Sequence, residues 1–478
     1  MARTIGKRQH DQQDGTETVI HGVLQMSKIA IVGAGVGGMA AAHDFVQAGH
    51  QVEIFEAADY VGGLAAGIKD PAWDWTVERY YHHWFQTDKA MLGLIEDLGW
   101  KDKVIFPRPK TVAYHNGKFY PLDSPLAALT FPGYNFFGMI RFGLATAYLR
   151  YLANWKTLEK YTAAEWMRRW YGEPVYKSLL EPLLVGKFGD HDREVNMAWM
   201  WARLKTRSTR LGTFQGGFQA FCDLFADNLR GRGVQIHLAT PVTQITPVDN
   251  GRVQLDLAAR NELAARSELG ARSEPGGGKQ IFDGCLVTSS PALLARLAPD
   301  LPKGYLQGLL GLKSMGAVVM TLALKHQLSE EGYYWFNLPK SAGYPFLALV
   351  EHTNFVSPEH FGGEHIVYCG DYLDPGHEYF QLSDEELFNR FSSGIKRFNP
   401  KFERDWVRKT WVSKTAYAQP IPLVNHSHNI PDIRTPLPGL YFASMSQVYP
   451  WDRGTNFAVE IGRRAARMML ADKINAKM

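Results

Sequence analysis

A glycine-rich turn near the start of the chain limits its folds more than any other feature of the sequence. An apolar run of strand length begins at Lys28 and ends at the turn, and a helix-forming segment follows. Gly33, Gly35 and Gly38 fit the spacing G-x-G-x-x-G: the first permits a tight turn, the second admits a pyrophosphate, and the third lets the helix pack on the strand. The pattern predicts a dinucleotide site at Gly33, Ala34, Gly35, Val36, Gly37 and Gly38.

An acidic residue stands where a ribose-binding carboxylate is expected. Residues 51–56 alternate as a second strand and finish on Glu56. Glu56 lies 23 residues after the first glycine, at the spacing of the carboxylate that binds ribose hydroxyls in such folds. NAD and FAD share this fingerprint, so the identity of the dinucleotide depends on other parts of the chain.

A second pair of glycines follows Glu56 and Ala57. Gly62, Gly63 and Leu64 form a Glu-x5-Gly-Gly arrangement with Glu56. This arrangement resembles the FAD-binding clan of flavin amine oxidases, protoporphyrinogen oxidases, phytoene desaturases and UDP-galactopyranose mutases. The resemblance implies that a second stretch of backbone, from Glu56 and Ala57 to Gly62, Gly63 and Leu64, binds the pyrophosphate and flavin of FAD.

The end of the chain carries an independent match to the same clan. A short strand at 439–443 and the segment 458–466 resemble the C-terminal flavin motif of the amine oxidases, with Trp451 in the loop between them. By position, the main chain near Thr455 would face the pyrimidine edge of the flavin. Ser444 and Met445 stand where the family has Gly followed by Thr, Glu or Asp. The cofactor contacts that the motif implies are Ser444, Met445, Trp451 and Thr455.

Two further expectations about the cofactor come from the resemblance. A looser match in the middle of the chain, a glycine pair before a helix and then a strand, assigns the adenine contact to Val242. No cysteine follows Cys369, so the C-terminal region offers none for covalent attachment. We therefore expect noncovalent FAD.

These motifs predict an α/β fold in which a Rossmann-like FAD-binding domain is discontinuous in sequence and a mixed α+β substrate domain fills the gaps. The FAD-binding domain is expected from residues 27–84, 211–290 and 439–472, and the substrate domain from residues 85–210 and 291–438. Residues 1–26 are polar and are expected to be a disordered extension, with Met26 as an alternative start. Residues 257–280 repeat a six-residue pattern and are expected to be a low-complexity loop insertion in a hairpin.

The composition excludes several other classes of protein. The 52 basic and 48 acidic residues give a formal net charge of +4, which does not indicate nucleic-acid binding. The three cysteines are too few and too far apart for a disulfide framework or a CxxC site. The most apolar window, 131–153, is interrupted by Arg141 and Arg150, so no transmembrane segment is predicted. We expect a cytoplasmic protein with a small-molecule substrate, and the sequence leaves peripheral membrane contact and the oligomeric state open.

The densest cluster of aromatic and titratable groups lies at 79–88. It resembles the His-hydrophobe-Phe-His-Thr loop of UDP-galactopyranose mutases, which implies that His83 lies by the flavin while Gln86 replaces the second histidine. His83 is the first catalytic candidate, either positioning the ring or transferring a proton, with simple packing as the alternative. Tyr417 is a second, looser candidate. No metal site is predicted, because the adjacent His82 and His83 point apart and no third ligand has suitable spacing.

Two features disfavour an ordinary amine as substrate. Met320 stands at the lysine position of the oxidase strand, and Gly454 stands at the position of one cage tyrosine. We predict an FAD-dependent oxidoreductase that abstracts hydride from a bulky, largely apolar substrate, by desaturation or ring oxidation. Two alternatives stay open: a redox-neutral mutase of the UDP-galactopyranose mutase type, for which the sequence shows no recognisable arginine pair for a diphosphate, and a flavin-binding protein without catalysis.

Overall fold

The computed structural model describes residues 26–258 and 278–475. The predicted extension at 1–26, except Met26, and most of the predicted insertion at 257–280 lie outside these residues. Where the insertion is described, its two ends belong to paired strands: β12 (Arg252–Leu257) and β13 (Gly278–Phe282) are antiparallel, with Leu257 opposite Gly278. Residues 278–280, expected in the loop, therefore lie in a strand of the hairpin.

A five-stranded parallel sheet carries the glycine turn. Its order is β10-β2-β1-β14-β20, and each neighbouring pair is parallel. The strands come from three distant parts of the chain: β1 (Lys28–Val32), β2 (Gln51–Phe55), β10 (Gln235–His237), β14 (Gly284–Val287) and β20 (Leu440–Phe442). Burial on both faces explains the mostly apolar sequences of β1, β14 and β20, whereas β2 and the edge strand β10 also carry polar residues.

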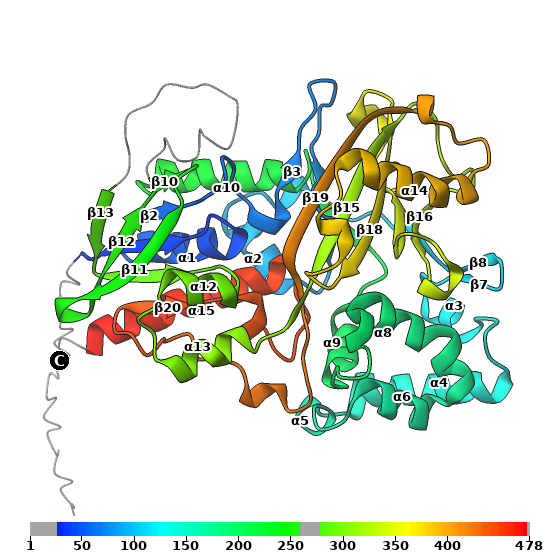
Figure 1. Cartoon of the computed structure of the whole chain (residues 1–478), viewed down its shortest axis with the longest axis horizontal. Coiled ribbons are helices and arrows are strands. Elements are labelled where there is room, and N and C mark those ends of the chain that lie inside the picture. Colours follow the sequence, from blue (N-terminus) through cyan, green and yellow to red (C-terminus); the bar gives the residue numbers. More distant parts are fainter. Residues whose placement is uncertain (1–25, 259–277, 476–478) are drawn as a thin grey trace, which may run out of the picture.

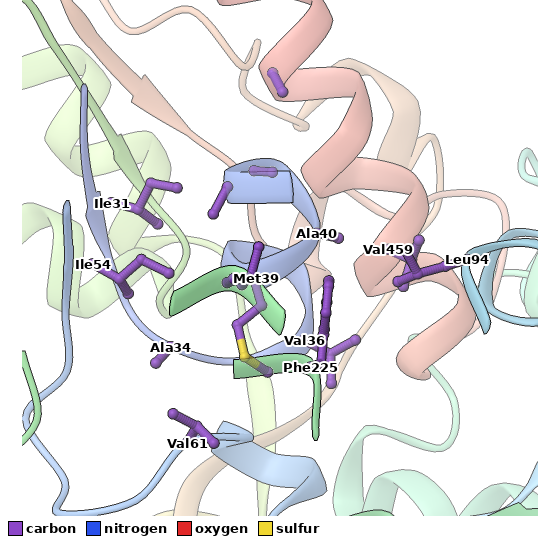
Figure 2. Packing of buried hydrophobic residues seen from close by; sticks show 14 of the residues in the cluster. Ile31, Ala34, Val36, Met39, Ala40, Ile54, Val61, Leu94, Phe225 and Val459 are labelled. Atoms are coloured by element: carbon purple, nitrogen blue, oxygen red, sulfur yellow. The ribbon is translucent and has the colours of Figure 1, made fainter. Parts of the chain in front are cut away.

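Both faces of this sheet are covered. Ile31 and Ile54 face a helical layer (Figure 2), whereas Ala30 and Val32 face the sheet β11-β12-β13 and α12 (Pro291–Leu297) on the other side. The helical layer consists of α1 (Val36–Gln47), α2 (Lys89–Asp97), α10 (Phe218–Gly231) and α15 (Thr455–Asn475). Strand β11, the first of the three-stranded sheet, spans Val242–Val248.

Two glycines bring α15 against α1. A Cβ atom placed on Gly462 would lie 2.1 Å from the carbonyl oxygen of Gly37, so the two backbones meet at a distance that a side chain would prevent. This contact holds the first turn of α15 beside the glycine turn, although the two are more than 400 residues apart in sequence. The helix that closes the chain is thereby part of the nucleotide end of the molecule.

A seven-stranded sheet forms the second part of the molecule (Figure 1), in the order β19-β15-β18-β17-β16-β7-β8. Its members are β7 (Lys110–His115), β8 (Lys118–Pro121), β15 (Ser314–Leu324), β16 (Tyr333–Asn337), β17 (Ala348–Glu351), β18 (His365–Leu373) and β19 (Val407–Pro420). Helix α14 (Asp384–Phe398) starts at a capping box of Ser383 and Glu386 and packs on one face.

A helical region lies beside the large sheet, at the lower right of Figure 1. Its core contains buried aromatic and aliphatic side chains that include Trp166, Tyr171, Trp199 and Phe188. Its helices are α3 (Pro125–Leu129), α4 (Phe136–Ala147), α5 (Trp155–Leu158), α6 (Ala163–Tyr171), α8 (Glu181–Phe188) and α9 (Ala198–Thr206). No helix in the described residues is both long enough and apolar enough to span a bilayer.

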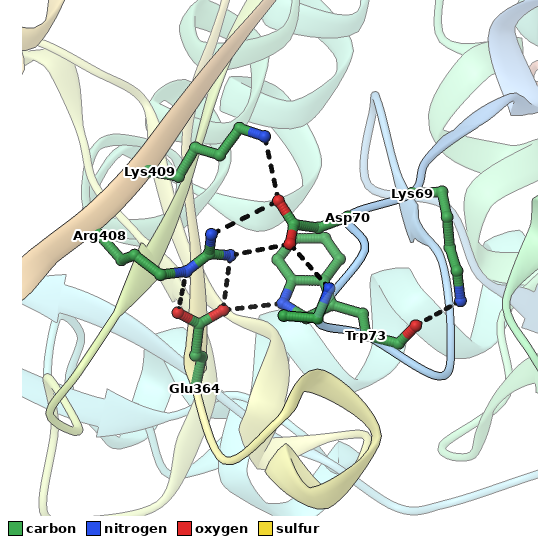
Figure 3. A network of polar contacts seen from close by, with 7 residues as sticks. Lys69, Asp70, Trp73, Glu364, Arg408 and Lys409 are labelled. Carbon is green, nitrogen blue, oxygen red and sulfur yellow. Dashed lines mark hydrogen bonds and ion pairs between the residues drawn. The ribbon is translucent and has the colours of Figure 1, made fainter.

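A polar network fastens the segment after the second glycine pair to the large sheet (Figure 3). Asp70 pairs with Lys409 at 3.0 Å and with Arg408 at 3.3 Å. Glu364 accepts hydrogen bonds from Arg408 and from the indole N–H of Trp73, both at 2.8 Å. The Asp70 side chain is only 3% exposed, so this network is screened by solvent less than a surface pair would be.

Candidate functional site

A cavity of about 1950 Å³ runs from the glycine turn, past the 79–88 segment, to the helical region. Three kinds of wall line it: backbone at the parallel sheet, side chains of the 79–88 segment in the middle, and both charged and apolar side chains at the helices. We call the part at the parallel sheet the nucleotide end and the part at α8 and α9 the inner end. The predicted cofactor residues can be tested by their place on this wall.

The three fingerprint glycines have three different surroundings. Gly33 has φ +108°, and a Cβ there would lie 2.7 Å from the hydroxyl of Thr288. A Cβ on Gly38 would lie 2.2 Å from the carbonyl oxygen of Gly33, which explains the close packing of α1 on the strand. A Cβ on Gly35 would meet no atom within 4 Å and would instead enter the cavity. The space beside Gly35 is therefore open to a ligand.

The second glycine pair lies directly against the first turn. The Gly62 N–H donates to the carbonyl of Ala34 at 2.9 Å, and Gly35 and Gly62 form a parallel bridge. A Cβ on Gly63 would come within 3.3 Å of the Gly35 Cα, and both glycines of the pair have positive φ. Two backbone stretches therefore border one space, as the resemblance implied.

Glu56 is fixed by backbone donors on both oxygens. The N–H of Ala34 donates to Oε2 at 2.8 Å, and the N–H of Ala58 donates to Oε1 at 2.9 Å. The carboxylate lines the cavity beside the glycine turn, and each oxygen keeps lone pairs for further hydrogen bonds. This geometry suits the binding of ribose hydroxyls.

The C-terminal motif reaches the cavity through the start of α15 and a short turn after β20. Thr455 begins α15 and accepts a hydrogen bond from the Trp84 indole at 2.9 Å. The Tyr417 hydroxyl lies 3.0 Å from the Ser444 hydroxyl and 2.8 Å from the Ser446 hydroxyl, and it also accepts from the Ser446 N–H at 2.9 Å. Tyr417 therefore holds the serine turn in place at the cavity wall.

Most of the predicted cofactor residues line this one cavity, although they come from four parts of the chain. The residues on the wall are Gly33, Gly35, Val36, Gly37, Gly38, Glu56, Ala57, Gly62, Gly63, Leu64, His83, Val242, Tyr417, Ser444, Met445 and Thr455. Ala34 is buried and takes part through its main chain. Trp451 is the exception: its ring stacks on Trp201 and Phe457 and is not part of the wall, so its placement does not support the predicted contact.

His83 lies in the middle of the cavity with an unused nitrogen. Its Nδ1 atom is buried without a hydrogen-bond partner, and its ring packs edge-on against Phe85. Burial lowers the pKa of His83 to about 3, and the charges of Arg207, His82 and Lys187 act in the same direction. The imidazole is therefore neutral at pH 7, which differs from the expectation that it titrates near neutrality.

Sequence reasoning missed a group of cations at the inner end, which we call the inner cationic group: Lys187, Arg203, Arg207 and Arg453. Lys187 lies on α8, Arg203 on α9, Arg207 just after α9, and Arg453 just before α15. Asp452 is the acid beside them, and it pairs with Arg203 at 3.4 Å. The only weak signal in the sequence was the four-residue spacing of Arg203 and Arg207, although α9 ends at Thr206, before Arg207.

The charges of the inner cationic group shift the pKa values of Lys187 and Asp452. Burial and the neighbouring cations hold the pKa of Lys187 well below its usual range. The pKa of Asp452 is lowered although burial acts in the opposite direction, because Arg203, Arg453 and Lys187 stabilise the carboxylate. The region has a positive potential that one carboxylate does not balance.

Met320 does not stand at the cavity. It lies on β15, as predicted, but its side chain is fully buried in the core between the large sheet and α14. The comparison of Met320 with the oxidase lysine is therefore wrong, because alternate residues of a strand face opposite sides. Gly454 does line the cavity.

Apolar side chains form the wall at the helical region. They include Leu129, Phe142, Leu179 and Leu183, which come from α3, α4 and the segment before and within α8. Tyr151 also lines the cavity and is 73% exposed, so it lies where the cavity meets solvent. A ligand in this part would be surrounded mainly by hydrocarbon.

Comparison with known proteins gives two kinds of match. The family model described as flavin containing amine oxidoreductase matches residues 36–470, which is most of the chain. A 15-cis-phytoene desaturase of Synechococcus elongatus is 25% identical over 252 residues, covering 48% of this chain and 52% of that protein. The chain thus spans about half the length of this relative.

Solved structures of different activity share the fold. A protein from Exiguobacterium sp. provisionally named a protoporphyrinogen oxidase has a TM-score of 0.70 at 17% identity, covering 93% of this chain and 99% of that chain. Reduced UDP-galactopyranose mutase has a TM-score of 0.69 at 14% identity, covering 93% and 96%. These matches confirm the predicted α/β fold class with its Rossmann-like domain. Because proteins named as oxidases and as a mutase share it, the fold does not decide the reaction.

Proposed function

Because the chain belongs to the flavin containing amine oxidoreductase family, we propose that it is an FAD-dependent oxidoreductase that abstracts hydride from a bulky, largely apolar substrate, by desaturation or ring oxidation. The observation that carries this proposal is the continuity of one cavity from the glycine turn to the apolar wall at Leu129, Phe142 and Leu183. Bound flavin supplies the hydride acceptor, while the chain binds, orients and shields the reactants.

The nucleotide end fits FAD better than a flavin mononucleotide. Glu56 and Val242 lie on the same wall as the two glycine stretches, which gives a place for an adenosine ribose and base beyond the pyrophosphate. Cys222, Cys285 and Cys369 are all fully buried, and none lies on the cavity wall. These facts support noncovalent FAD.

We assign different roles to the two catalytic candidates. His83, neutral and with a free Nδ1, would orient the reactants by a hydrogen bond or accept a proton once a bound anion offsets the nearby positive charge. Tyr417 uses its hydroxyl on the serine turn, so it would act as a positioning residue for Ser444. Both roles are predictions that substitution can test.

We also propose that the exposed face of α4 and the following π-helical turn Tyr148–Leu152 contacts a lipid surface. The exposed side chains recur at helical spacing: Phe137, Ile140, Leu144, Tyr148 and Tyr151. An apolar face of this kind marks a membrane or protein interface. We favour lipid because the opposite face of the same helix, including Phe142, lines the cavity, and an apolar substrate would enter there from the membrane.

One specific observation favours the alternative function, a redox-neutral mutase. The inner cationic group includes three arginines, so the groups for a diphosphate that the sequence did not reveal are present in the cavity. A mutase would turn over only with reduced flavin and without a net electron acceptor, whereas an oxidoreductase would cycle between the two states. The two alternatives therefore differ in a measurable requirement.

An anaerobic reduction assay tests the proposal. The oxidised holoprotein is mixed with phytoene and with related apolar polyenes without oxygen, and the visible absorption of the flavin is followed. We expect at least one apolar substrate to bleach the flavin and a quinone to restore the colour. If no apolar compound bleaches it, while UDP-galactopyranose is isomerised only after photoreduction, the mutase replaces the oxidoreductase. Failure of both would leave a flavin-binding protein without catalysis.

A further inference from the structure

We propose that the inner cationic group binds a phosphate or diphosphate ester of the substrate, so that the substrate is an apolar molecule with a polyvalent anionic head. The inference deepens the proposed function, on which it rests for the apolar part of the substrate. It adds a recognition element that the family membership does not supply.

The four cations converge although they come from three segments. The Lys187 Nζ and the Arg453 guanidinium lie 4.2 and 4.9 Å from the centre of the same Tyr372 ring. Arg453 also donates to the Tyr372 hydroxyl, and its main-chain neighbour Asp452 meets Arg203. Arg207 follows Arg203 by four residues and lies just past the end of α9, where the backbone is extended. Tyr372 and Asp452 therefore hold Lys187, Arg203 and Arg453 together at one end of the cavity.

The charges of this group are not balanced by protein acids. In the part of the chain that the structure describes, the pair of Arg203 with Asp452 is the only ion pair that the four cations make. Lys187 and Arg207 have no recorded hydrogen bond to a side chain or to the backbone in those residues. Arg203 is buried and Lys187 and Arg453 are half-buried, so water solvates these charges only in part, whereas Arg207 is exposed at the edge of the group. An anion bound among them would offset a charge that Asp452 alone does not balance.

A polyvalent anion fits this group better than a carboxylate. One carboxylate would offset a single cation and leave the rest unbalanced. A phosphate monoester carries about −1.5 to −2 at pH 7, and arginine pairs bind its oxygens through two parallel hydrogen bonds. Three guanidinium groups and one amine provide donors for the several oxygens of a diphosphate.

The position of the group relative to the apolar wall defines the rest of the ligand. Lys187 and Leu183 lie one helical turn apart on α8, and both line the cavity. Arg203 and the wall residue Met200 are likewise close on α9. A molecule held by its phosphate at the cations would therefore extend its body along hydrocarbon.

Calorimetric titration of the flavin-loaded protein with inorganic pyrophosphate tests the inference. We expect saturable binding that weakens as salt is added, because charge pairing supplies most of the affinity. Arg207→Gln should weaken binding about tenfold and the double variant Arg207→Gln with Lys187→Met about a hundredfold, whereas Arg207→Lys should keep most of it. Arg230→Gln, at the exposed end of α10, is the control and should bind as the unaltered protein does.

Thermal unfolding without ligand separates a binding role from a structural one. If the cations serve to bind an anion, Arg207→Gln should reduce the repulsion among them in the ligand-free protein. The unfolding temperature should then stay unchanged or rise, while the affinity for pyrophosphate falls. A lower unfolding temperature with unchanged affinity would overturn the inference. Binding that both Arg207→Gln and the double variant leave unchanged would also overturn it, because the pyrophosphate would then occupy another part of the protein.

A final comparison identifies the source of the phosphate. Farnesyl diphosphate, UDP and inorganic pyrophosphate are titrated separately, and we expect the first to bind at least tenfold more tightly than the others because of its apolar chain. Tighter binding of UDP would assign the body of the ligand to a nucleotide instead. Binding of none of the three to a protein that retains flavin would refute this inference alone, whereas loss of flavin binding would refute the proposed function.

Discussion

The two ends of the cavity bind by different means. At the nucleotide end, the wall consists of glycine backbone and of one carboxylate whose oxygens already accept two N–H groups. At the inner end, the wall consists of long cationic side chains with one acid among them. At the nucleotide end, the carboxylate is already held by hydrogen bonds when no ligand is bound, which suits a resident cofactor. At the inner end, one acid does not balance the charge of the cations, which suits an anionic ligand that binds and leaves.

The largest effect should come from Gly35→Val. Because a Cβ at this position meets no protein atom within 4 Å and the backbone there is extended, the variant should fold normally. Its branched side chain would occupy the space of the pyrophosphate, so we expect no flavin to remain bound after gel filtration. Gly93→Val, at an equally open glycine on α2, is the control and should retain flavin. Full flavin occupancy in Gly35→Val would place the cofactor elsewhere.

Glu56→Ala should have the next largest effect. The substitution removes charge-assisted hydrogen bonds to ribose hydroxyls, worth about 1.5 to 3 kcal/mol, which corresponds to roughly 10- to 100-fold weaker FAD binding. It also leaves the N–H groups of Ala34 and Ala58 without their acceptor. Glu56→Gln keeps an acceptor oxygen and should weaken binding less. Equal affinity of all three proteins in equilibrium titration with FAD would contradict the ribose assignment.

The buried histidines in the middle of the cavity should make stability sensitive to acid. An unfolded histidine with a pKa of 6.5 takes up a proton below that pH, whereas folded His83, with a pKa of about 3, does not. The contribution of His83 is therefore complete above pH 6.5 and is lost as the pH falls toward 3, by roughly 2 kcal/mol at pH 5.

Urea unfolding at pH 7 and pH 5 measures this effect. His83→Asn should lose less stability between the two pH values than the unaltered protein, and so should His82→Asn, since burial lowers the pKa of His82 to about 4. The exposed His428→Asn should behave as the unaltered protein does. Parallel curves for all the variants would show that burial does not keep His82 and His83 neutral in the folded protein.

The smallest effect concerns lipid contact. Phe137 and Leu152 are 73% and 78% exposed, and replacing both by serine should reduce sedimentation with vesicles several-fold. Leu310→Ser, at a 63% exposed residue on α13 (Lys303–Leu310), is the control and should leave vesicle binding unchanged. If the unaltered protein does not sediment with vesicles, the face belongs to a protein contact.

The nucleotide end could be predicted from sequence because its chemistry is local. A turn such as Gly33–Gly38 needs particular residues at fixed spacing, so the sequence carries the pattern directly. The inner end has no such pattern, because Lys187, Arg203 and Arg453 are ordinary surface residue types until the fold brings α8, α9 and the start of α15 together. Met320 shows a further limit: its strand was predicted, but a strand pattern buried on both faces does not show which face a residue occupies.

Cofactor identification tests the central claim most directly. The purified protein is precipitated with acid, and the supernatant and pellet are examined for flavin by chromatography and absorbance. The cavity geometry predicts FAD in the supernatant, in amounts close to one per chain. Flavin that stays with the pellet, flavin mononucleotide or NAD in place of FAD, or a colourless protein that does not take up added FAD would contradict the account.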